Sequence, residues 1–193
     1  MQNKTFIHTP NEEVTLGDGR RLWLSRSVAV ACQVIVRNLL DGHLYTLIVK
    51  RGPASLGSPG LWCFPCGYLD HDESARAASI RETYEEAGID LDAFMVNPEF
   101  QYKRSDLNEE PWHVDSAPNH FRQNVTLNFC FYFETNGGSV PVETSINCEL
   151  GEIDEVKWVK VDEVINDYQM AFDHNLLMSD IAKKLVIRTR NIF

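Results

Sequence analysis

Gly67–Ile89, GYLDHDESARAASIRETYEEAGI, has the most informative pattern in this sequence. It carries Glu82, Glu85 and Glu86, which are spaced i, i+3 and i+4. On an α-helix these positions share one face with Cβ atoms about 5–6 Å apart, so the three like charges repel one another. Folding does not require such a cluster, and carboxylate oxygens suit Mg²⁺, Mn²⁺ or Ca²⁺. The spacing therefore predicts a helix that holds a divalent cation.

The ends and the sides of this helix can also be predicted. Asp70 or Asp72 can cap its start, with Asp70 and Glu73 at capping-box spacing, and Gly88 has the position of a terminating glycine. Four residues recur on the side opposite the three glutamates: Ala77, Ile80, Tyr84 and Ala87. Because each residue turns a helix by about 100°, we expect the helix to bury that side and to present its carboxylates outward.

Composition limits the classes of partner. The length of 193 residues fits one domain, and a hydrophobic fraction of 44% is ordinary for a globular protein. The net charge of −10 argues against a nucleic-acid polymer as partner, although a bound metal can reverse the local charge and admit a small phosphorylated ligand. There is no apolar run of roughly 20 residues, and residues 1–13 lack the apolar segment of a signal peptide. We therefore expect no membrane association and a cytoplasmic location.

The five cysteines favour reduced thiols, since their number is odd. Cys63 and Cys66 form a CxxC pair. A redox pair would begin a helix after a strand, and a zinc site would need a second pair of ligands, which the sequence does not offer at metal spacing. We expect two unlinked thiols in a strand and loop.

Hydrophobic periodicity and turn residues outline the other elements. We expect an N-terminal hairpin at about 5–25 that turns at Gly17-Asp18-Gly19. The predicted strands are 27–36, 43–50, 61–64, a piece within 92–102, 123–134 and 156–161. The predicted helices are 161–165 and one capped by Asp173, with an apolar stripe of Leu177, Ile181 and Leu185. Residues 103–119 are expected to be a long polar loop, and no change in composition marks a second domain.

The stretch from Gly67 resembles the signature of the Nudix hydrolase family. That signature reads Gly, five residues, Glu, seven residues, Arg-Glu-aliphatic-any-Glu-Glu-any-Gly-aliphatic. Every charged and glycine position is present, and Thr83 stands where an aliphatic residue is commoner. Flanking residues that are also similar are Trp62, Phe64-Pro65, Glu152 ahead of 156–159, and Phe172-Asp173-His174, which is similar to members that act on ADP-ribose-like substrates.

The resemblance implies an α/β (α+β) fold, an α/β/α sandwich around a mixed β-sheet. It implies a single Nudix domain over 1–193, with an N-terminal extension at about 1–25 and a substrate-side loop at about 103–121. The implied activity is Mg²⁺- or Mn²⁺-dependent hydrolysis of a pyrophosphate linkage in a nucleoside diphosphate derivative, of the ADP-ribose or nucleotide-sugar class, which releases a nucleoside monophosphate. A homodimer is also implied by the family.

The resemblance assigns the metal site residue by residue. Glu82, Glu85 and Glu86 correspond to the family's metal ligands. The main-chain carbonyl of Cys66 corresponds to a further ligand. Glycine is usual at that position, and its backbone freedom is wider than that of cysteine.

Three further charged residues receive roles from the same resemblance. Arg81 would pair with Glu73 or with a ligand carboxylate and hold the geometry of the site. Glu73 is interpreted as a helix cap, a salt-bridge partner or an outer-shell metal ligand. Glu152 is the first choice for the general base and Glu85 the second. Glu152 can also be a solvated acid beside Asp154.

Substrate recognition is predicted only as a set of candidates. The candidate phosphate contacts are Arg26, Arg51, Arg104 and Arg122. The candidate base-stacking residues, at about 1–3 kcal/mol per stacked base, are Trp112, His113, His120 and Phe121. For each arginine the alternative is a solvated or structural side chain, and for each aromatic residue it is packing within the loop.

Two other functions are consistent with this signature. The first is a sanitising hydrolase of oxidised or deoxy nucleoside triphosphates, which would release pyrophosphate. A hydrolase of diphosphate derivatives would instead release a nucleoside monophosphate. A ligand-sensing module that is not an enzyme would bind the nucleotide derivative without cleaving it. The long segment 103–119 and Phe172-Asp173-His174 favour the hydrolase of diphosphate derivatives over the sanitising hydrolase. The complete set of signature carboxylates and the acidic charge favour an enzyme over the sensing module.

Overall fold

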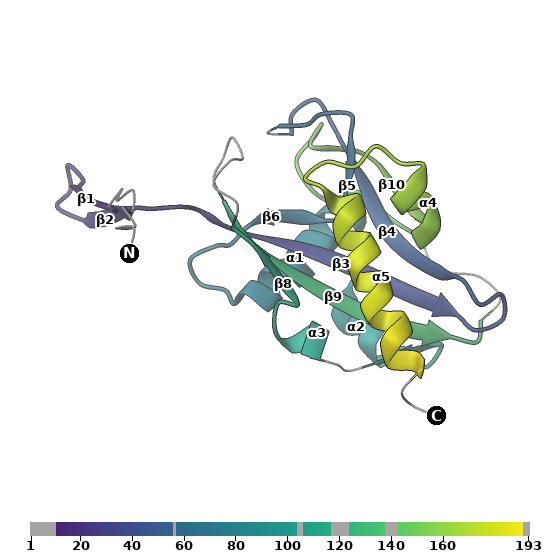
Figure 1. The fold of residues 1–193 in the computed structure, drawn as a ribbon. Helices are drawn as coiled ribbons and strands as arrows, with labels where there is room; N and C mark the ends of the chain where they lie inside the picture. The colour runs from purple at the N-terminus through teal and green to yellow at the C-terminus, as the bar shows by residue number, and fades with distance from the viewer. Residues whose placement is uncertain (1–10, 56, 104–105, 117–123, 138–142, 191–193) are drawn as a thin grey trace, which may run out of the picture.

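A mixed eight-stranded sheet forms the centre of the computed structural model, which describes residues 11–55, 57–103, 106–116, 124–137 and 143–190 (Figure 1). Its strands are β3 (Val28–Asn38), β4 (Leu44–Arg51), β5 (Trp62–Cys63), β6 (Cys66–Tyr68), β7 (Phe100–Tyr102), β8 (His113–Asp115), β9 (Val125–Thr135) and β10 (Ile153–Lys160). The main order is β10-β4-β3-β9-β7, while β5 pairs with β4, β6 with β3 and β8 with β9. The predicted strands are confirmed, although β10 begins three residues earlier than expected.

Strands β3 and β9 are the long central pair. They run parallel, from Val28 opposite Val125 to Asn38 opposite Thr135. Both are rich in β-branched and aromatic residues, which favour strands, and most of their residues are buried. The other described pairings of the sheet are antiparallel. The parallel pair therefore gives the rest of the sheet a fixed, buried axis.

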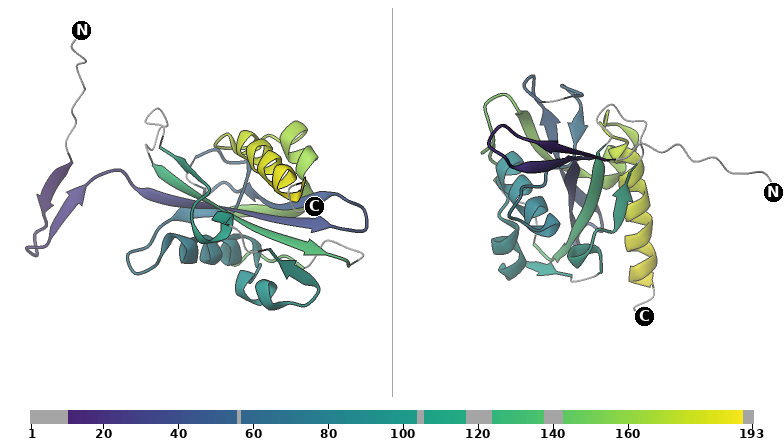
Figure 2. Two further views of the ribbon diagram at one scale, coloured as in Figure 1. Left: turned by 60° about the horizontal axis from the view of Figure 1, so that its bottom comes forward. Right: turned by 90° about the vertical axis from the view of Figure 1, so that its left-hand side faces the viewer.

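Helices cover both faces of the sheet, as Figure 2 shows. On one face lie α1 (Ala75–Ala87) and α2 (Leu91–Val96), which pack on one hydrophobic cluster. On the other lie α4 (Val161–Asn166) and α5 (His174–Arg190), which pack on a second cluster. The predicted α/β/α sandwich is confirmed. The predicted stripe of α5 is also confirmed, because Leu177, Ile181 and Leu185 all belong to the second cluster.

The N-terminal hairpin consists of β1 (Glu12–Thr15) and β2 (Arg21–Leu24), which pair with each other in a separate two-stranded sheet. It extends away from the main body (Figures 1 and 2). Three of its large apolar side chains are exposed: Leu22, Trp23 and Leu24. The predicted hairpin is confirmed over 12–24, and the remainder of the prediction, residues 5–10, lies outside the described residues. Among the helices of the described residues, none is both long and apolar enough to cross a membrane.

Two predicted segments differ in the structure. Within 92–102, the helix α2 precedes the three-residue strand β7, because the Asp90 side chain accepts a hydrogen bond from the Ala93 N–H and caps a helix there. The segment 103–119 is not irregular throughout. It contains α3 (Asp106–Glu109) and β8, which pairs with the central strand β9. Its aromatic residues therefore belong partly to the sheet.

The start of α1 also differs from the prediction. Ser74 is its N-cap, and the Ser74 Oγ accepts a hydrogen bond from the Ala77 N–H at 3.2 Å. Neither Asp70 nor Asp72 caps the helix, since the chain turns between 70 and 73 before it becomes helical. The main-chain N–H of Asp70 donates to the Glu73 carboxylate at 3.0 Å. The predicted end is confirmed, with Gly88 in the left-handed conformation at φ 71°.

Candidate active site

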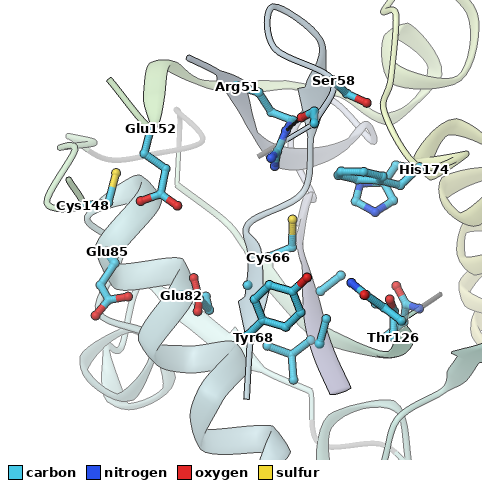
Figure 3. A pocket seen from close by; sticks show the side chains of 18 of the residues that line it. Arg51, Ser58, Cys66, Tyr68, Glu82, Glu85, Thr126, Cys148, Glu152 and His174 are labelled. Atoms are coloured by element: carbon cyan, nitrogen blue, oxygen red, sulfur yellow. Dashed lines mark hydrogen bonds between the residues drawn. The ribbon is translucent and has the colours of Figure 1, made fainter. Parts of the chain in front are cut away.

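A cavity of about 630 Å³ opens over the sheet at the start of β3 and β9. Its floor includes Ala29 and Ala31, whose short side chains leave space above the sheet. Figure 3 shows Glu82, Glu85 and Glu152 together on one side, with His174 across from them and Arg51 between.

The carboxylates of α1 point inward, and the prediction that they face outward is wrong. Glu82 and Glu86 are buried at 9% and 2% exposure, whereas Tyr84, which was expected to be buried, is 51% exposed. Ala77 is also exposed, while Ile80 and Ala87 do contribute to the core. The physical reason lies in β6. A Cβ at Gly67 would lie 2.1 Å from the Glu82 Oε1, so only glycine lets this carboxylate approach the strand.

A second contact holds the helix to β6. The main-chain N–H of Cys66 donates to the Glu86 Oε2 at 2.9 Å. Cys66 pairs with Ala31 of β3 in extended conformation, which any residue can adopt. A cysteine in place of the usual glycine is therefore compatible with the backbone here. We call Glu82, Glu85, Glu86 and Glu152 the acidic wall.

Arg81 ties the acidic wall together. Its Nη1 donates to the Glu82 Oε1 and to the Glu85 Oε2, each at 2.8 Å. Its Nε and Nη2 donate to the two oxygens of Glu73 at 3.1 and 2.7 Å. The predicted pairing of Arg81 with Glu73 and with ligand carboxylates is confirmed. The contact with Arg81 lowers the pKa of Glu73 and raises the pKa of Arg81.

Burial makes the acidic wall costly to ionise. It raises the pKa of Glu82 to about 7, against the opposing effect of Arg81. It also raises the pKa of Glu86 well above its usual value, and the neighbouring Cys66 adds to the shift. Both shifts mean that folding brings negative charge into a poorly solvated place. A cation supplied to this wall would relieve that cost.

The remaining acid, Glu152, comes from the turn before β10 and lines the cavity beside Glu82 and Glu85. Its main-chain carbonyl accepts hydrogen bonds from the Gly52 N–H at 2.8 Å and from the Ser55 Oγ. These contacts fix the turn against the loop after β4. The backbone of Glu152 is therefore held in place while its carboxylate faces the cavity.

The thiols of Cys63 and Cys66 are unlinked, as predicted. A hydrogen bond with Cys63, together with burial, raises the pKa of the Cys66 thiol. Burial also raises the pKa of Cys148, to about 11. Since thiolates are the reactive form, these groups line the cavity as neutral side chains.

Across the cavity, His174 at the start of α5 is a neutral hydrogen-bond donor. Its Nδ1 accepts the main-chain N–H of Phe64 at 3.0 Å, and its ring stacks on the Phe64 ring with centroids 4.7 Å apart. Burial, and then the charge of Arg51, lower the pKa of His174 to about 3. The proton of the neutral ring is therefore on Nε2, which is the nitrogen left for the cavity.

Asn128 of β9 also lines the cavity. It shares a face of the strand with Cys130 and Tyr132, which pack in the cluster under α5, the helix that begins at His174. Its Oδ1 accepts a hydrogen bond from the Gln33 Nε2 at 3.2 Å. Its Nδ2 is buried and, within the described part of the chain, has no hydrogen-bond partner. We call Asn128 and His174 the donor wall.

The family model of the NUDIX domain matches residues 27–181 of this sequence. The chain belongs to the Nudix family.

Relatives of known structure or function agree with this assignment. RNA pyrophosphohydrolase of Bartonella bacilliformis is 27% identical over 156 residues, which are 81% of this chain and 81% of the relative. The NUDIX domain of Shewanella oneidensis NrtR, solved with ADP ribose, has 19% identity and a TM-score of 0.59, over 84% of this chain and 90% of that one. A bifunctional NMN adenylyltransferase/ADP ribose pyrophosphatase of Francisella tularensis, solved with AMP and a Mn ion, has 23% identity and a TM-score of 0.59, over 83% of this chain and 42% of that one. The family match and the Bartonella relative confirm the predicted class, a Nudix pyrophosphohydrolase, and the two solved structures confirm the fold.

The Nudix signature carboxylates fit a hard divalent cation by their chemistry. All are oxygen donors, and Gly67 leaves room for them beside β6. In the described residues, however, no three His, Cys, Asp or Glu side chains converge closely enough to hold a metal ion. The reason is Arg81, whose Nη1 draws both Glu82 and Glu85 onto itself. The donor set fits the metal, and the carboxylates must turn from Arg81 to bind it.

The Nudix cavity contains only some of the predicted substrate residues. Arg51 lines it and is 7% exposed, with its Nε on the Gly57 carbonyl at 2.8 Å and its guanidinium 5.1 Å from the centre of the Phe172 ring. Arg26, Trp112 and His113 are not part of the lining. The other candidates lie outside the described residues: Arg104, His120, Phe121 and Arg122.

Sequence reasoning missed the donor wall. His174 was noted only as part of Phe172-Asp173-His174, and this motif was the one signal that pointed to it. Asn128 lies within a strand and carries no local signature. Its place in the cavity follows from the pairing of β9 with β3, which no short motif reveals.

Proposed function

We propose that this Nudix chain hydrolyses, with a divalent metal, a pyrophosphate linkage in a nucleoside diphosphate derivative of the ADP-ribose or nucleotide-sugar class. The product would be a nucleoside monophosphate. One observation carries the proposal: a single cavity is lined by the carboxylates of Glu82, Glu85 and Glu152 at one end and by the neutral donor wall at the other. Such a cavity can take a metal-bound pyrophosphate at the first end and an uncharged group at the second.

The metal would be Mg²⁺ or Mn²⁺, held by Glu82, Glu85, Glu86 and the main-chain carbonyl of Cys66. When bound, such an ion neutralises charge on the pyrophosphate oxygens and activates water. The Mn ion in the Francisella structure supports this choice. The raised pKa values of Glu82 and Glu86 support it too, because a cation offsets the cost of burying their charges.

The chain's own residues would then have separate roles. Arg81, itself fixed by Glu73, would keep Glu82 and Glu85 beside the metal position until their carboxylates turn to the ion. Glu152 is the first choice for the base that accepts a proton from the attacking water, since its carboxylate faces the cavity beside the ligand carboxylates. Glu85 is the second choice. Glu73 then serves as a positioning residue rather than as a metal ligand.

Arg51 would contact a phosphate of the substrate. It lines the cavity between the two walls, and its Nε is fixed by Gly57. A guanidinium that is pre-oriented in this way loses little conformational freedom when it binds an anion. For Arg26, Arg104, Trp112 and Arg122 we keep a substrate contact only as a sequence-based hypothesis.

The substrate class has support from the relatives. One similar structure contains ADP ribose and another contains AMP, which is the monophosphate product expected here. The test is a screen of ADP-ribose, nucleotide sugars and nucleoside triphosphates with Mg²⁺ or Mn²⁺, with analysis of the products. Release of a monophosphate from a diphosphate derivative is the expected result. A panel that stays uncleaved with both metals would refute the proposal.

A second candidate is hydrolysis of triphosphates with release of pyrophosphate, either as nucleotide sanitising or at the end of an RNA. The RNA pyrophosphohydrolase of Bartonella bacilliformis favours it. The net charge of −10 does not favour an RNA polymer. The same screen separates the two candidates, because their products differ. If the chain instead binds ADP-ribose and cleaves nothing, it is a sensing module.

We propose that residues 1–193 form one Nudix domain with the N-terminal hairpin as an extension. We also propose a homodimer, in which the exposed Leu22, Trp23 and Leu24 of the hairpin are covered by the second copy. Light scattering tests this, and a monomeric mass at micromolar concentration would refute it.

A further inference from the structure

A chain of three side chains fixes the amide of Asn128. The Trp112 Nε1 donates to the Gln33 Oε1 at 2.7 Å, and the Gln33 Nε2 donates to the Asn128 Oδ1 at 3.2 Å. Gln33 and Asn128 are both fully buried, and Trp112 is half-buried. The main-chain N–H of Trp112 also donates to the Asn128 carbonyl at 2.9 Å, which holds Trp112 beside the strand.

The donor and acceptor atoms in this series of hydrogen bonds are fixed by the Trp112 indole. An indole nitrogen can only donate a hydrogen bond. Gln33 must therefore turn its oxygen toward Trp112 and its amino group toward Asn128. Asn128 must then turn its oxygen toward Gln33, and its amino group is left over as a donor. Reversal of either amide would place two donors or two acceptors face to face.

The leftover amino group belongs to a residue that lines the cavity, and it has no partner among the described residues. A buried donor without a partner costs about 1–3 kcal/mol, so a native protein rarely keeps one without a reason. Gln33 itself lies behind Asn128 and is not part of the lining. The hydrogen bonds from Trp112 through Gln33 thus fix the orientation of one buried donor, the amino group of a residue that lines the cavity.

His174, at the start of α5, repeats this design. The main-chain N–H of Phe64 can only donate, so the His174 Nδ1 must accept and the Nε2 must carry the proton. Figure 3 shows the His174 ring pointing into the cavity. Two neutral donors, each fixed by an obligate donor behind it, therefore line one end of a cavity that has carboxylates at its other end.

We propose that the donor wall recognises an uncharged hydrogen-bond acceptor on the nucleoside part of the substrate, with Asn128 as a binding residue and Gln33 and Trp112 as positioning residues. The acceptor is a carbonyl or ring nitrogen of the nucleobase, or an oxygen of the sugar. This inference rests on the proposed function, which places the pyrophosphate at the acidic wall. It assigns specificity to residues that are far apart in the sequence.

Three variants test the donor wall. Asn128→Leu removes the donor at similar volume, and Trp112→Phe removes the indole N–H while it leaves Asn128 in place. Thr46→Val is the matched control, because Thr46 is a buried polar residue of β4 that does not line the cavity. Melting curves first establish which variants are folded. KM and kcat are then measured on ADP-ribose, and calorimetry gives the Kd of AMP and of ribose 5-phosphate in Mg²⁺.

We expect Asn128→Leu to raise KM about tenfold and to leave kcat within about twofold, since one hydrogen bond to the ligand is lost. If the Kd of AMP rises and that of ribose 5-phosphate does not, the acceptor is on the base. If both rise equally, it is on the sugar. An unchanged Kd for both ligands in folded Asn128→Leu overturns the proposal.

Trp112→Phe should raise KM about threefold without a change in kcat, because the Gln33 and Asn128 amides become free to turn. A loss of thermal stability with an unchanged KM would show a purely structural role and overturn the positioning claim. Thr46→Val should match the wild type in both constants. If the wild-type protein fails to cleave ADP-ribose, the proposed activity fails on this substrate, while the AMP and ribose 5-phosphate affinities still decide the donor wall.

Discussion

The acidic wall and the donor wall solve opposite physical problems within one cavity. The acidic wall concentrates charge, and burial opposes that charge by raising the pKa of Glu82 and of Glu86. The donor wall has no charge, and each of its donors is fixed by a group that can only donate. The acidic wall therefore needs a bound cation before all its carboxylates are ionised. The donor wall already has its donors oriented without a ligand.

This difference separates chemistry from selection. A wall that holds a metal does not discriminate between substrates by their nucleoside or sugar parts, because every pyrophosphate presents the same oxygens. Neutral donors at fixed positions distinguish ligands by the acceptors that they present. Changes to the acidic wall should thus reduce turnover of every substrate, and changes to the donor wall should change which substrate is preferred.

The largest expected effect is the loss of a metal ligand. Glu85→Gln and Glu86→Gln should each lower kcat/KM at least about 100-fold, because an amide oxygen replaces a charged ligand. The folded state should persist, since the glutamine oxygen can still accept the Cys66 N–H. Steady-state assays with Mg²⁺ measure the loss, with Glu155→Gln, an acid of β10 that does not line the cavity, as the control. Full activity in both variants would place the metal elsewhere.

A smaller loss is expected from Arg81→Gln. Arg81 contacts Glu73, Glu82 and Glu85 but is not a metal ligand, and removal of such a supporting residue typically costs about 10–100-fold in metal affinity or activity. The loss should appear mainly as a higher Mg²⁺ concentration for half-maximal rate. Arg81 also competes with the metal for two carboxylates, so a variant that binds Mg²⁺ more tightly than the wild type would show that competition is its main effect.

The two walls should respond to pH in opposite directions. The pKa of Glu82 is about 7 when folded and about 4.5 when unfolded. Between these values the folded state binds the extra proton, so this residue makes the metal-free protein less stable as pH rises, by about 1.4 kcal/mol per pH unit. Glu82→Gln should remove this contribution, so the stability of the variant should rise with pH, relative to that of the wild type, by about 1.4 kcal/mol per unit. Urea unfolding in chelator at pH 5 and pH 6 measures it, and an unchanged slope would contradict the burial of this charge.

His174 should give the opposite slope. Its pKa is about 3 when folded and 6.5 when unfolded, so between these values the unfolded state binds the extra proton. The stability that this residue contributes is fully present above the unfolded pKa. As the pH decreases below that value, the stability decreases by about 1.4 kcal/mol per pH unit. The contributions of Glu82 and His174 largely cancel each other between pH 4.5 and 6.5. His174→Gln should therefore leave a protein that becomes more stable as pH falls toward 5.

The same contrast explains what the sequence could predict. The acidic wall comes mainly from one helix, so the spacing of Glu82, Glu85 and Glu86 identified it. The direction in which it faces could not be predicted, because it depends on the absence of a side chain at Gly67 on another element. The prediction from helical periodicity rested on the rule that carboxylates face solvent. That rule does not hold for carboxylates that line a functional site.

The donor wall could not be predicted at all as a site. Trp112, Gln33 and Asn128 lie on separate stretches of the chain, and only the pairing of β8, β9 and β3 brings them together. The predicted sandwich was confirmed because strands such as β9 carry strong alternation. The segment 103–119 was misjudged because three-residue strands like β8 leave too short a pattern.

The most direct measurement of the central claim is binding of Mn²⁺ followed by electron paramagnetic resonance in the wild type, Glu86→Gln and Asn128→Leu. If the acidic wall holds the metal and the donor wall does not, Glu86→Gln should weaken Mn²⁺ binding at least about tenfold, and Asn128→Leu should bind it like the wild type. Equal Mn²⁺ affinity in the wild type and in Glu86→Gln would contradict the account.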